Sequence, residues 1–377
     1  MNASALTRLR AWMEAQGFTR FFVQQPENFA WLSGGGDNTV VVFRPVAAWL
    51  EVTPASVRLH ASQIEAGRLL EEEVPGLKVV RYPWYSPPSP EGPSDLEHDL
   101  TPLRLVLSPE EQARYRALGQ DAAAALGESL RFADPGWSEQ ELAGAISEAL
   151  LSRGIQPLVL LVAGEERLFR YRHPIPKHHR LGRLFMGVIC GRRHGLIANL
   201  SRLRSFGHPE AQRLNRQVCQ VEAAALEASR PGATLGEVLE KIRAAYRAIG
   251  HPQEFENHHQ GGLTGYKSRE VLARPGHPTR LEPGMALAWN PSLPGAKVED
   301  TFCSAKMGWR TLPLTPPGPC CRLEDICARW CSRVRWNKPP AKPPPNPWTQ
   351  APRMLNRPCS RIFLAPNPAY PSRLLAA

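Results

Sequence analysis

The sequence predicts a two-domain protein of the α/β class. At 377 residues the chain is long for one domain and typical of about two. Hydrophobic residues make up 42% of it, enough for a large core. Helical and strand-like patterns alternate up to residue 106, and a different order of paired helices and paired strands follows.

The first 106 residues read as a compact α/β domain. Leu6, Leu9 and Trp12 recur at helical spacing in residues 4–16, and Gly17 supplies a C-terminal stop. A Pro-rich stretch at 88–95 has the composition of a linker or long loop. The intervening segments are predicted as strands at 18–24 and 77–84, a helical turn and loop at 26–36, a hairpin at 39–54, and a helix at 60–73.

Residues 107–302 form the second predicted domain. Two helices begin at capping boxes, Ser108 with Glu111 and Ser138 with Glu141, where a side chain at each position caps a backbone N–H of the other. The order becomes helix, helix, hairpin, helix, helix, hairpin. The further elements are predicted as a strand at 157–164, a strand pair at 183–207 around a turn at 191–195, and helices at 210–232 and 234–250.

Residues 303–377 have a different composition from the rest. They hold 12 of the 46 Lys and Arg residues, 2 of the 35 acidic residues, 6 of the 8 cysteines and 15 of the 38 prolines. A Pro-rich, basic and disordered tail is the direct interpretation. The cysteines of CCRLEDICARWC lack the paired spacing and the histidines of a zinc template, so we do not expect a zinc site there.

The genetic code offers a second explanation of this tail. If FCSAKMGWRTLPLTP is read one base earlier, codons exist that give LLSEDGLENLTLDP after Phe302. That sequence has two strand-like runs around an Asp-Gly turn, the pattern of a hairpin, which the present frame lacks. We therefore hypothesise a frameshift near Cys303 that replaced the native C-terminus and its last strand.

Charge and cysteine usage limit the function classes. The formal net charge of +11 resembles a nucleic-acid signal, but residues 303–377 carry almost all of it and the rest is close to neutral. No run approaches the roughly 18 apolar residues of a membrane span, and the first residues lack a signal-peptide core. Two cysteines in residues 1–302 suit a reducing compartment. We expect a cytoplasmic protein that binds neither nucleic acid nor membrane.

The stretch FENHHQGGLTGYKSRE, residues 255–270, concentrates side chains that can do chemistry. His258 and His259 precede two glycines, and Tyr266, Arg269 and Glu270 follow. A metal site, an acid/base site and hydrogen-bonded core histidines are all consistent with this pattern.

Five motifs together resemble one protein family. They are Pro135-Gly136 with the SEQEL helix, the strand pair ending in NLSR, HHQGG, LEPGM and VEDT. With RFFVQQPENFAWLSG near the start, the chain is similar over about 300 residues to creatinase, prolidase and aminopeptidase P. The resemblance implies a creatinase-type N-terminal domain and a C-terminal pita-bread domain, with helices flanking a pseudo-twofold β-sheet.

The same resemblance implies two divalent metals held by two aspartates, one histidine and two glutamates. Such metals generate a nucleophile from water at neutral pH. The matching positions here are Ile189, Asn199, His259, Asn290 and Glu299. Only one of the four carboxylates remains, so the expected site is degenerate and undercharged. The sequence establishes no cofactor, and we expect at most one weakly bound Mn, Co or Zn ion.

The resemblance also implies the remaining site residues. His173 matches a histidine that contacts substrate, and in metal-free creatinase this histidine acts as acid and base. We therefore expect His173, His259, Glu270 and Glu299 to converge as catalytic groups, with the carboxylates favouring imidazolium. Arg193, His258, Tyr266 and Arg269 are candidates for substrate binding. Solvated charge at Arg193 and simple ring packing of Tyr266 are the alternatives.

Two function classes remain open from the sequence. One is a hydrolase similar to Xaa-Pro dipeptidases and aminopeptidases, or a metal-free amidinohydrolase like creatinase. The other is a non-catalytic protein that binds a peptide or small molecule on the same fold. In either case we expect a homodimer.

Overall fold

The structure is a computed structural model that describes residues 1–40, 46–305 and 308–311, all within one compact unit. It is a mixed α/β fold, as predicted, in which the described residues form four sheets. The expected division at residue 106 stays a prediction.

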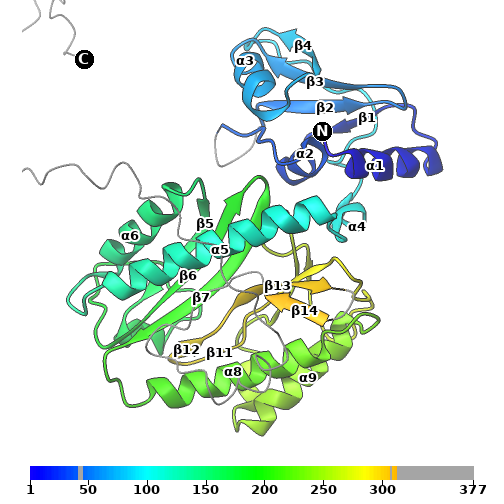
Figure 1. Ribbon diagram of the computed structural model, residues 1–377. Helices are drawn as coiled ribbons and strands as arrows, with labels where there is room; N and C mark the ends of the chain where they lie inside the picture. Colours follow the sequence, from blue (N-terminus) through cyan, green and yellow to red (C-terminus); the bar gives the residue numbers. More distant parts are fainter. Residues whose placement is uncertain (41–45, 306–307, 312–377) are drawn as a thin grey trace, which may run out of the picture. The chain divides into compact units, whose positions relative to one another are not determined.

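The N-terminal part is a four-stranded sheet with helices packed on it (Figure 1). The strand order is β1-β2-β3-β4, and only the β3–β4 pair is parallel. Leu9 and Met13 of the first helix are fully buried, as helical spacing requires. The elements are α1 (Ala3–Ala15), β1 (Phe21–Val23), α2 (Pro26–Ser33), β2 (Ala48–Val52), β3 (Val57–Ser62), α3 (Ala66–Arg68), a π-helical turn (Leu69–Glu73) and β4 (Lys78–Tyr82).

Two predictions in this part were wrong in their boundaries. The hairpin joins β2 to β3, at 48–62, rather than lying at 39–54, of which residues 41–45 are outside the described residues. The helix expected from residue 60 begins at Ala66, because residues 57–62 are a strand. Leu59 and Ala61 are buried while their neighbours are only partly covered, which is the alternation of a strand.

The following part carries long helices that begin where the capping boxes predict. Ser108 caps α5 and Ser138 caps α6, each with the reciprocal glutamate bond, and Thr234 with Glu237 makes a third box at α9. The elements in chain order are α4 (Thr101–Arg104), α5 (Pro109–Phe132), α6 (Glu139–Leu151), β5 (Gln156–Ala163), α7 (Glu165–Leu168), β6 (Leu184–Arg193), β7 (Leu196–Ser205), α8 (Ala211–Ala228), α9 (Leu235–Ala248) and a 3-10 turn (Pro252–Phe255).

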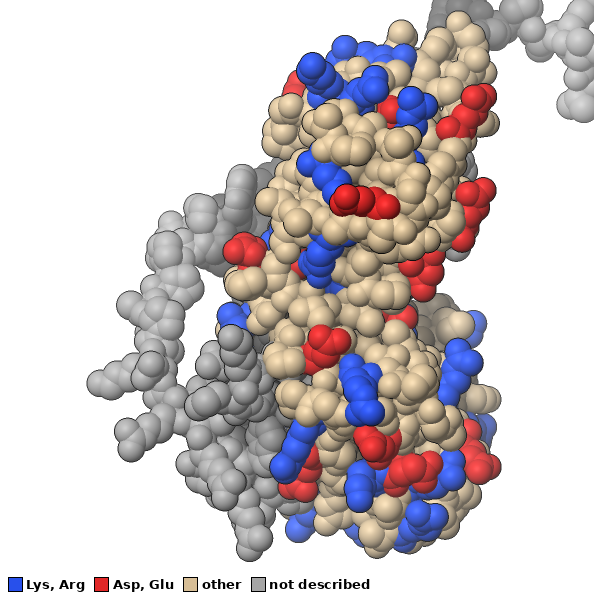
Figure 2. Space-filling model, turned by 90° about the vertical axis from the view of Figure 1, so that its right-hand side faces the viewer, with Lys and Arg blue, Asp and Glu red and all other residues tan. Residues whose placement is uncertain are grey.

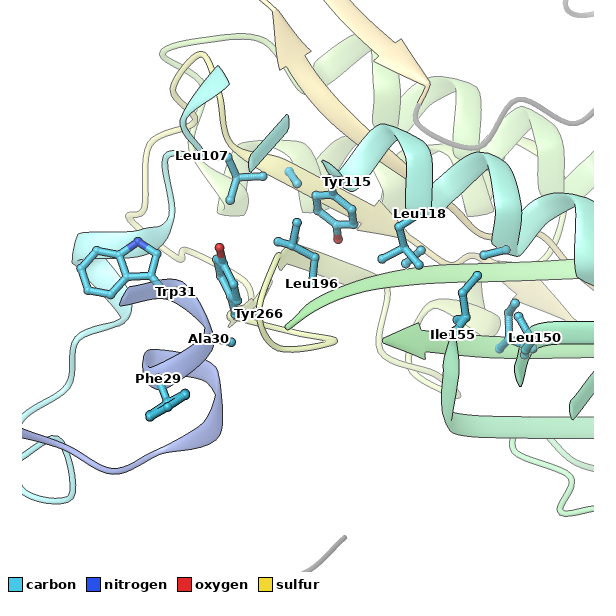
Figure 3. Close-up of a cluster of buried hydrophobic side chains, with 14 of the residues drawn as sticks. Phe29, Ala30, Trp31, Leu107, Tyr115, Leu118, Leu150, Ile155, Leu196 and Tyr266 are labelled. Carbon is cyan, nitrogen blue, oxygen red and sulfur yellow. The ribbon is translucent and has the colours of Figure 1, made fainter. Parts of the chain in front are cut away.

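The two faces of the β6–β7 pair have different surroundings. Ile189 and Leu200 are directly opposite each other in the ladder and belong to the large apolar core that includes α5 and α6. Figure 3 shows Tyr115 and Leu118 of α5 directed toward the strand that carries Leu196 in this core. Because side chains alternate along a strand, Asn199 and its partner Cys190 point to the other face.

A second, five-stranded sheet follows in the C-terminal part of the described chain. Its order is β14-β13-β10-β8-β9, and all of its pairs are antiparallel. It extends through Thr311, so the expectation of a disordered tail was wrong for residues 303–305 and 308–311, and the present frame does form a hairpin of β13 and β14; the rest of the tail lies outside the described residues. The strands are β8 (Gly261–Thr264), β9 (Val271–Leu272), β10 (Ala286–Trp289), β13 (Asp300–Ala305) and β14 (Gly308–Thr311), with a separate hairpin of β11 (Ser292–Leu293) and β12 (Ala296–Lys297).

Candidate functional site

The HHQGG segment is a tightly bonded turn that leads into β8. Gln260 donates to the carbonyl oxygens of Phe255 (3.1 Å) and His258 (2.6 Å), and its own amide oxygen accepts from Tyr246 at 3.1 Å. Gly261 and Gly262 have φ of 110° and 153°, and a Cβ on either would lie within 2.1 Å of a strand carbonyl oxygen. The turn therefore fixes the two histidines in front of the sheet.

His173 comes from a distant segment and joins these histidines. The neighbouring Arg172 forms an ion pair with Glu254, in the 3-10 turn just before His258 and His259. The Nε2 atoms of His173 and His258 are 3.0 Å apart, so one ring donates to the other. One ligand nitrogen from each of the three rings lies within 4.8 Å of the others. We call His173, His258 and His259 the histidine cluster.

The histidine cluster is held in the neutral state. Burial, followed by the nearby charge of Lys297, lowers the pKa of His258 to about 2. Burial and the charge of Arg269 lower the pKa of His259 to about 4, and burial with Lys297 also lowers that of His173. Glu299 opposes these effects but is outweighed. The expectation of an imidazolium beside carboxylates was therefore wrong, because burial disfavours the charged ring and the cations Lys297 and Arg269 add to that effect.

Glu299 is buried, and two cationic side chains balance the charge of its ionised carboxylate. It accepts from Arg269 at 2.6 Å and from the Ser201 hydroxyl at 3.0 Å, and Lys297 is 3.3 Å away. Burial alone would raise the pKa of Glu299, but the charges of Lys297 and Arg269 and these hydrogen bonds lower it to about 2. We call Lys297, Glu299 and Arg269 the ion triad; its net charge is positive.

The other positions expected to bind metal offer weak ligands or none. Asn199 and Asn290 are almost fully buried, and the Oδ1 atom of each has no hydrogen-bond partner among the described residues. Ile189 lies in the apolar core and faces away from Asn199, so the register does not support it as the first ligand position. Cys190 faces the site instead, and burial raises the pKa of its thiol to about 12.

A pair of hard divalent cations does not fit these residues. The expected set retains one carboxylate, Glu299, and two protein cations already contact it. Two unit charges about 4 Å apart interact by about 4 kcal/mol at an effective dielectric constant near 20. A divalent ion at the same distance would meet about twice that repulsion from each of Lys297 and Arg269. The histidine cluster has ligand atoms close enough for one softer ion, but it adjoins the same two cations.

Glu270 forms hydrogen bonds with residues outside the histidine cluster. Its carboxylate makes two bonds with Arg104, at 2.7 and 3.0 Å, and both side chains are about 1% exposed. It also accepts from the backbone N–H groups of Tyr266 (2.9 Å) and Lys267 (3.3 Å). These contacts commit the carboxylate of Glu270 to Arg104 and to the backbone of the 266–270 segment, and the expectation that it acts in catalysis stays a prediction.

Two of the expected substrate-binding residues are also engaged elsewhere. The Tyr266 hydroxyl donates to Glu111 of α5 at 2.6 Å and is buried. Arg193 binds Asp121 at 2.7 Å and the carbonyl oxygen of Arg153 at 3.0 Å. Neither is available for a substrate carboxylate in this arrangement. His258 and Arg269 do lie at the site, next to His173 and Glu299 respectively.

Lys297 is the site residue that the sequence reasoning missed. It is 5% exposed, on β12. Its position two residues before Glu299 was the available signal, since residues two apart in an extended segment share a face.

Charges of both signs are mixed on one face of the described residues. Figure 2 shows basic and acidic side chains interspersed over the face in view. Among the described residues, no helix is both long and apolar enough to span a membrane. The expectations about partners and localisation stay predictions.

Comparison with solved structures identifies the fold. The prolidase from Pyrococcus horikoshii OT3 superposes with a TM-score of 0.70 at 17% identity, covering 83% of this chain and 98% of that one. The Xaa-Pro dipeptidase from Bacillus anthracis gives 0.68 at 17% identity, with the same coverage. The prolidase from Pyrococcus furiosus gives 0.68 at 19% identity, covering 81% and 99%. The predicted pita-bread fold is confirmed.

Sequence comparison leads to the same family. An uncharacterized peptidase of Staphylococcus aureus (strain MW2) is 23% identical over an alignment of 236 residues that covers 58% of this chain; the chain spans 65% of that relative's length. The family model of the M24 metallopeptidases matches residues 113–328, more than half of the sequence. The chain therefore belongs to metallopeptidase family M24.

Proposed function

We propose that this protein hydrolyses the C–N bond of a small peptide-like substrate without a pair of metal ions, using a neutral histidine as the base. The observation that carries the proposal is the histidine cluster, three neutral imidazoles beside the positively charged ion triad. The family and its peptidase-named relatives support hydrolysis. Names such as prolidase and Xaa-Pro dipeptidase among similar structures suggest Xaa-Pro dipeptides as the first substrates to test.

His173 suits the role of the base. A general base must be unprotonated, and the lowered pKa of His173 keeps it so at neutral pH. It is exposed, so water and substrate can reach it, while His258 orients its ring. In the proposed step, His173 takes a proton from water as the oxygen attacks the carbonyl carbon. The imidazolium then gives that proton to the leaving nitrogen as the C–N bond breaks.

Lys297 and Arg269 supply the positive charge that this step needs. Negative charge develops on the carbonyl oxygen during the attack, and fixed cations in a shielded site stabilise it. Both residues lie within 4 Å of Glu299, which restrains their position. Glu299 in this scheme orients the two cations rather than transferring a proton.

A purified full-length chain treated with EDTA provides the test. Xaa-Pro dipeptides and creatine are assayed for amine release, with and without added Mn²⁺ or Co²⁺. We expect turnover in EDTA that falls by about 10²-fold or more in His173→Ala, with KM little changed. His178→Ala, an exposed histidine on the same segment, is the matched control. Turnover that appears only with two equivalents of metal would contradict the proposal.

A non-catalytic binding protein is the second candidate. It is favoured by one observation: both expected acidic groups are committed to buried ion pairs, Glu299 with Lys297 and Arg269, and Glu270 with Arg104. Tight binding of a dipeptide without turnover on any substrate in the panel would select this candidate.

A further inference from the structure

We propose that the ion triad and the histidine cluster together form a binding site for the carboxylate group of a small organic acid. The site uses residues of the proposed function and rests on that assignment. Three features lead to a carboxylate: an uncompensated positive charge, donors without partners, and a side open to solvent.

The charge balance of the site favours an anion. Lys297 and Arg269 share a single carboxylate, Glu299, and no other acidic side chain forms an ion pair with either cation within residues 1–40 and 46–303. One positive charge is therefore left over, and one carboxylate would neutralise it. A divalent cation would instead increase the excess.

Donors are available for such a ligand. The Nε atom of Arg269 is buried and has no hydrogen-bond partner among the described residues. The ring of His259 contacts the rings of His173 and His258, with centroids 6.1 and 4.6 Å away, and makes no hydrogen bond with the described part of the chain. Arginine and neutral imidazole both donate well to carboxylate oxygens.

The site is reachable from solvent on one side. His173 and His259 are exposed, whereas His258, Lys297 and Glu299 are buried. A carboxylate entering at the two exposed rings would approach the buried ammonium of Lys297 while the rest of the acid stays near the surface. A site with one open side favours a terminal carboxylate of a small molecule over a carboxylate in the middle of a longer peptide.

Binding of N-acetylglycine tests the inference, with N-acetylglycinamide as the neutral ligand of matched shape. The full-length protein in EDTA is titrated at constant ionic strength while the imidazole C–H resonances of its histidines are followed by NMR. We expect the acid to shift the resonances of the histidine cluster saturably, and the amide to bind at least tenfold more weakly. Lys297→Met should weaken binding of the acid at least tenfold, and Lys177→Met, at an exposed lysine, should leave it unchanged.

Glu299→Gln separates a carboxylate site from a metal site. Removing the negative charge should tighten binding of the acid severalfold, because Lys297 and Arg269 then keep their full positive charge for the ligand. A metal site would lose affinity in this variant. Three results would overturn the inference. The acid and the amide could bind equally well, or Lys297→Met could leave the affinity for the acid unchanged. The three histidines could also bind Co²⁺ stoichiometrically, with an affinity that Glu299→Gln weakens. The NMR titration measures binding alone. Carboxylate binding can therefore be confirmed even if the protein hydrolyses no substrate, and hydrolysis can be confirmed even if the acid does not bind.

Discussion

The buried pair of Arg104 and Glu270 makes a sharp prediction about stability. Both side chains are about 1% exposed, and two hydrogen bonds join them at 2.7 and 3.0 Å. Arg104 also contacts Asn28 at 2.5 Å and Thr101 at 3.0 Å. The pair therefore fixes the segment that carries Arg269 against α2 and α4.

The magnitude follows from what each substitution leaves behind. Glu270→Gln leaves the Arg104 charge buried with only neutral acceptors, and Arg104→Met leaves the Glu270 charge with two backbone N–H donors. Breaking a buried pair in this way costs about 3–5 kcal/mol of the free energy of unfolding. The double substitution leaves no unpaired charge, so its cost should be smaller than the sum by about 1–3 kcal/mol.

Urea unfolding followed by circular dichroism measures these differences. A protein of ordinary stability, about 5–15 kcal/mol, still folds after such a loss, but its midpoint falls clearly. Lys267→Met is the matched control, because Lys267 joins the same segment to Glu27 of α2 at 3.1 Å while being 42% exposed. Its cost should stay below about 1 kcal/mol. Two results would refute the reasoning. One is an equally small loss of unfolding free energy in Glu270→Gln and Lys267→Met. The other is a double substitution at Arg104 and Glu270 whose loss equals the sum of the two single losses.

Three further predictions concern metal, pH and the C-terminus. Elemental analysis after purification without chelator should find well below two equivalents of Mn, Co or Zn per chain, since Asn199 and Asn290 cannot replace carboxylates; two tightly held ions would contradict this. Because the pKa of His258 is about 2 in the folded protein and near 6.5 when unfolded, only the unfolded state gains this proton as pH falls below about 6.5. Stability should then decrease by about 1.4 kcal/mol per pH unit from this group, and His258→Gln should reduce that slope in urea titrations. Replacing residues 303–377 with LLSEDGLENLTLDP should raise the melting temperature if the frameshift hypothesis holds, and an equal or lower value would count against it.

Much of the fold could be predicted because local patterns determine it. Ser108 and Ser138 cap their helices as the spacing to Glu111 and Glu141 requires. The hairpin of β2 and β3 was misplaced because a strand followed by a short helix has the same apolar content as a longer helix. Tertiary pairing, which local composition does not contain, separates the two.

The chemistry of the site was less predictable because it depends on distances between remote residues. The resemblance placed Glu299 and the histidines together, but the direction of the histidine pKa shifts comes first from burial and then from the charges of Lys297 and Arg269. Likewise, nothing local to Glu270 indicates that Arg104, 166 residues away, takes its carboxylate. Ion pairs of this kind become visible only once the chain is folded.

The position of Cys190 has a practical consequence. Its thiol is 8% exposed and its pKa is about 12, so it is almost entirely protonated at neutral pH. Alkylating reagents are attacked by the thiolate and hardly by the thiol, so Cys190 should react only when the β6–β7 pair separates from the sheet beyond it. The rate of its labelling under native conditions would therefore measure how often the site opens by local unfolding, and a ligand that closes the site would slow that rate without touching the sulfur.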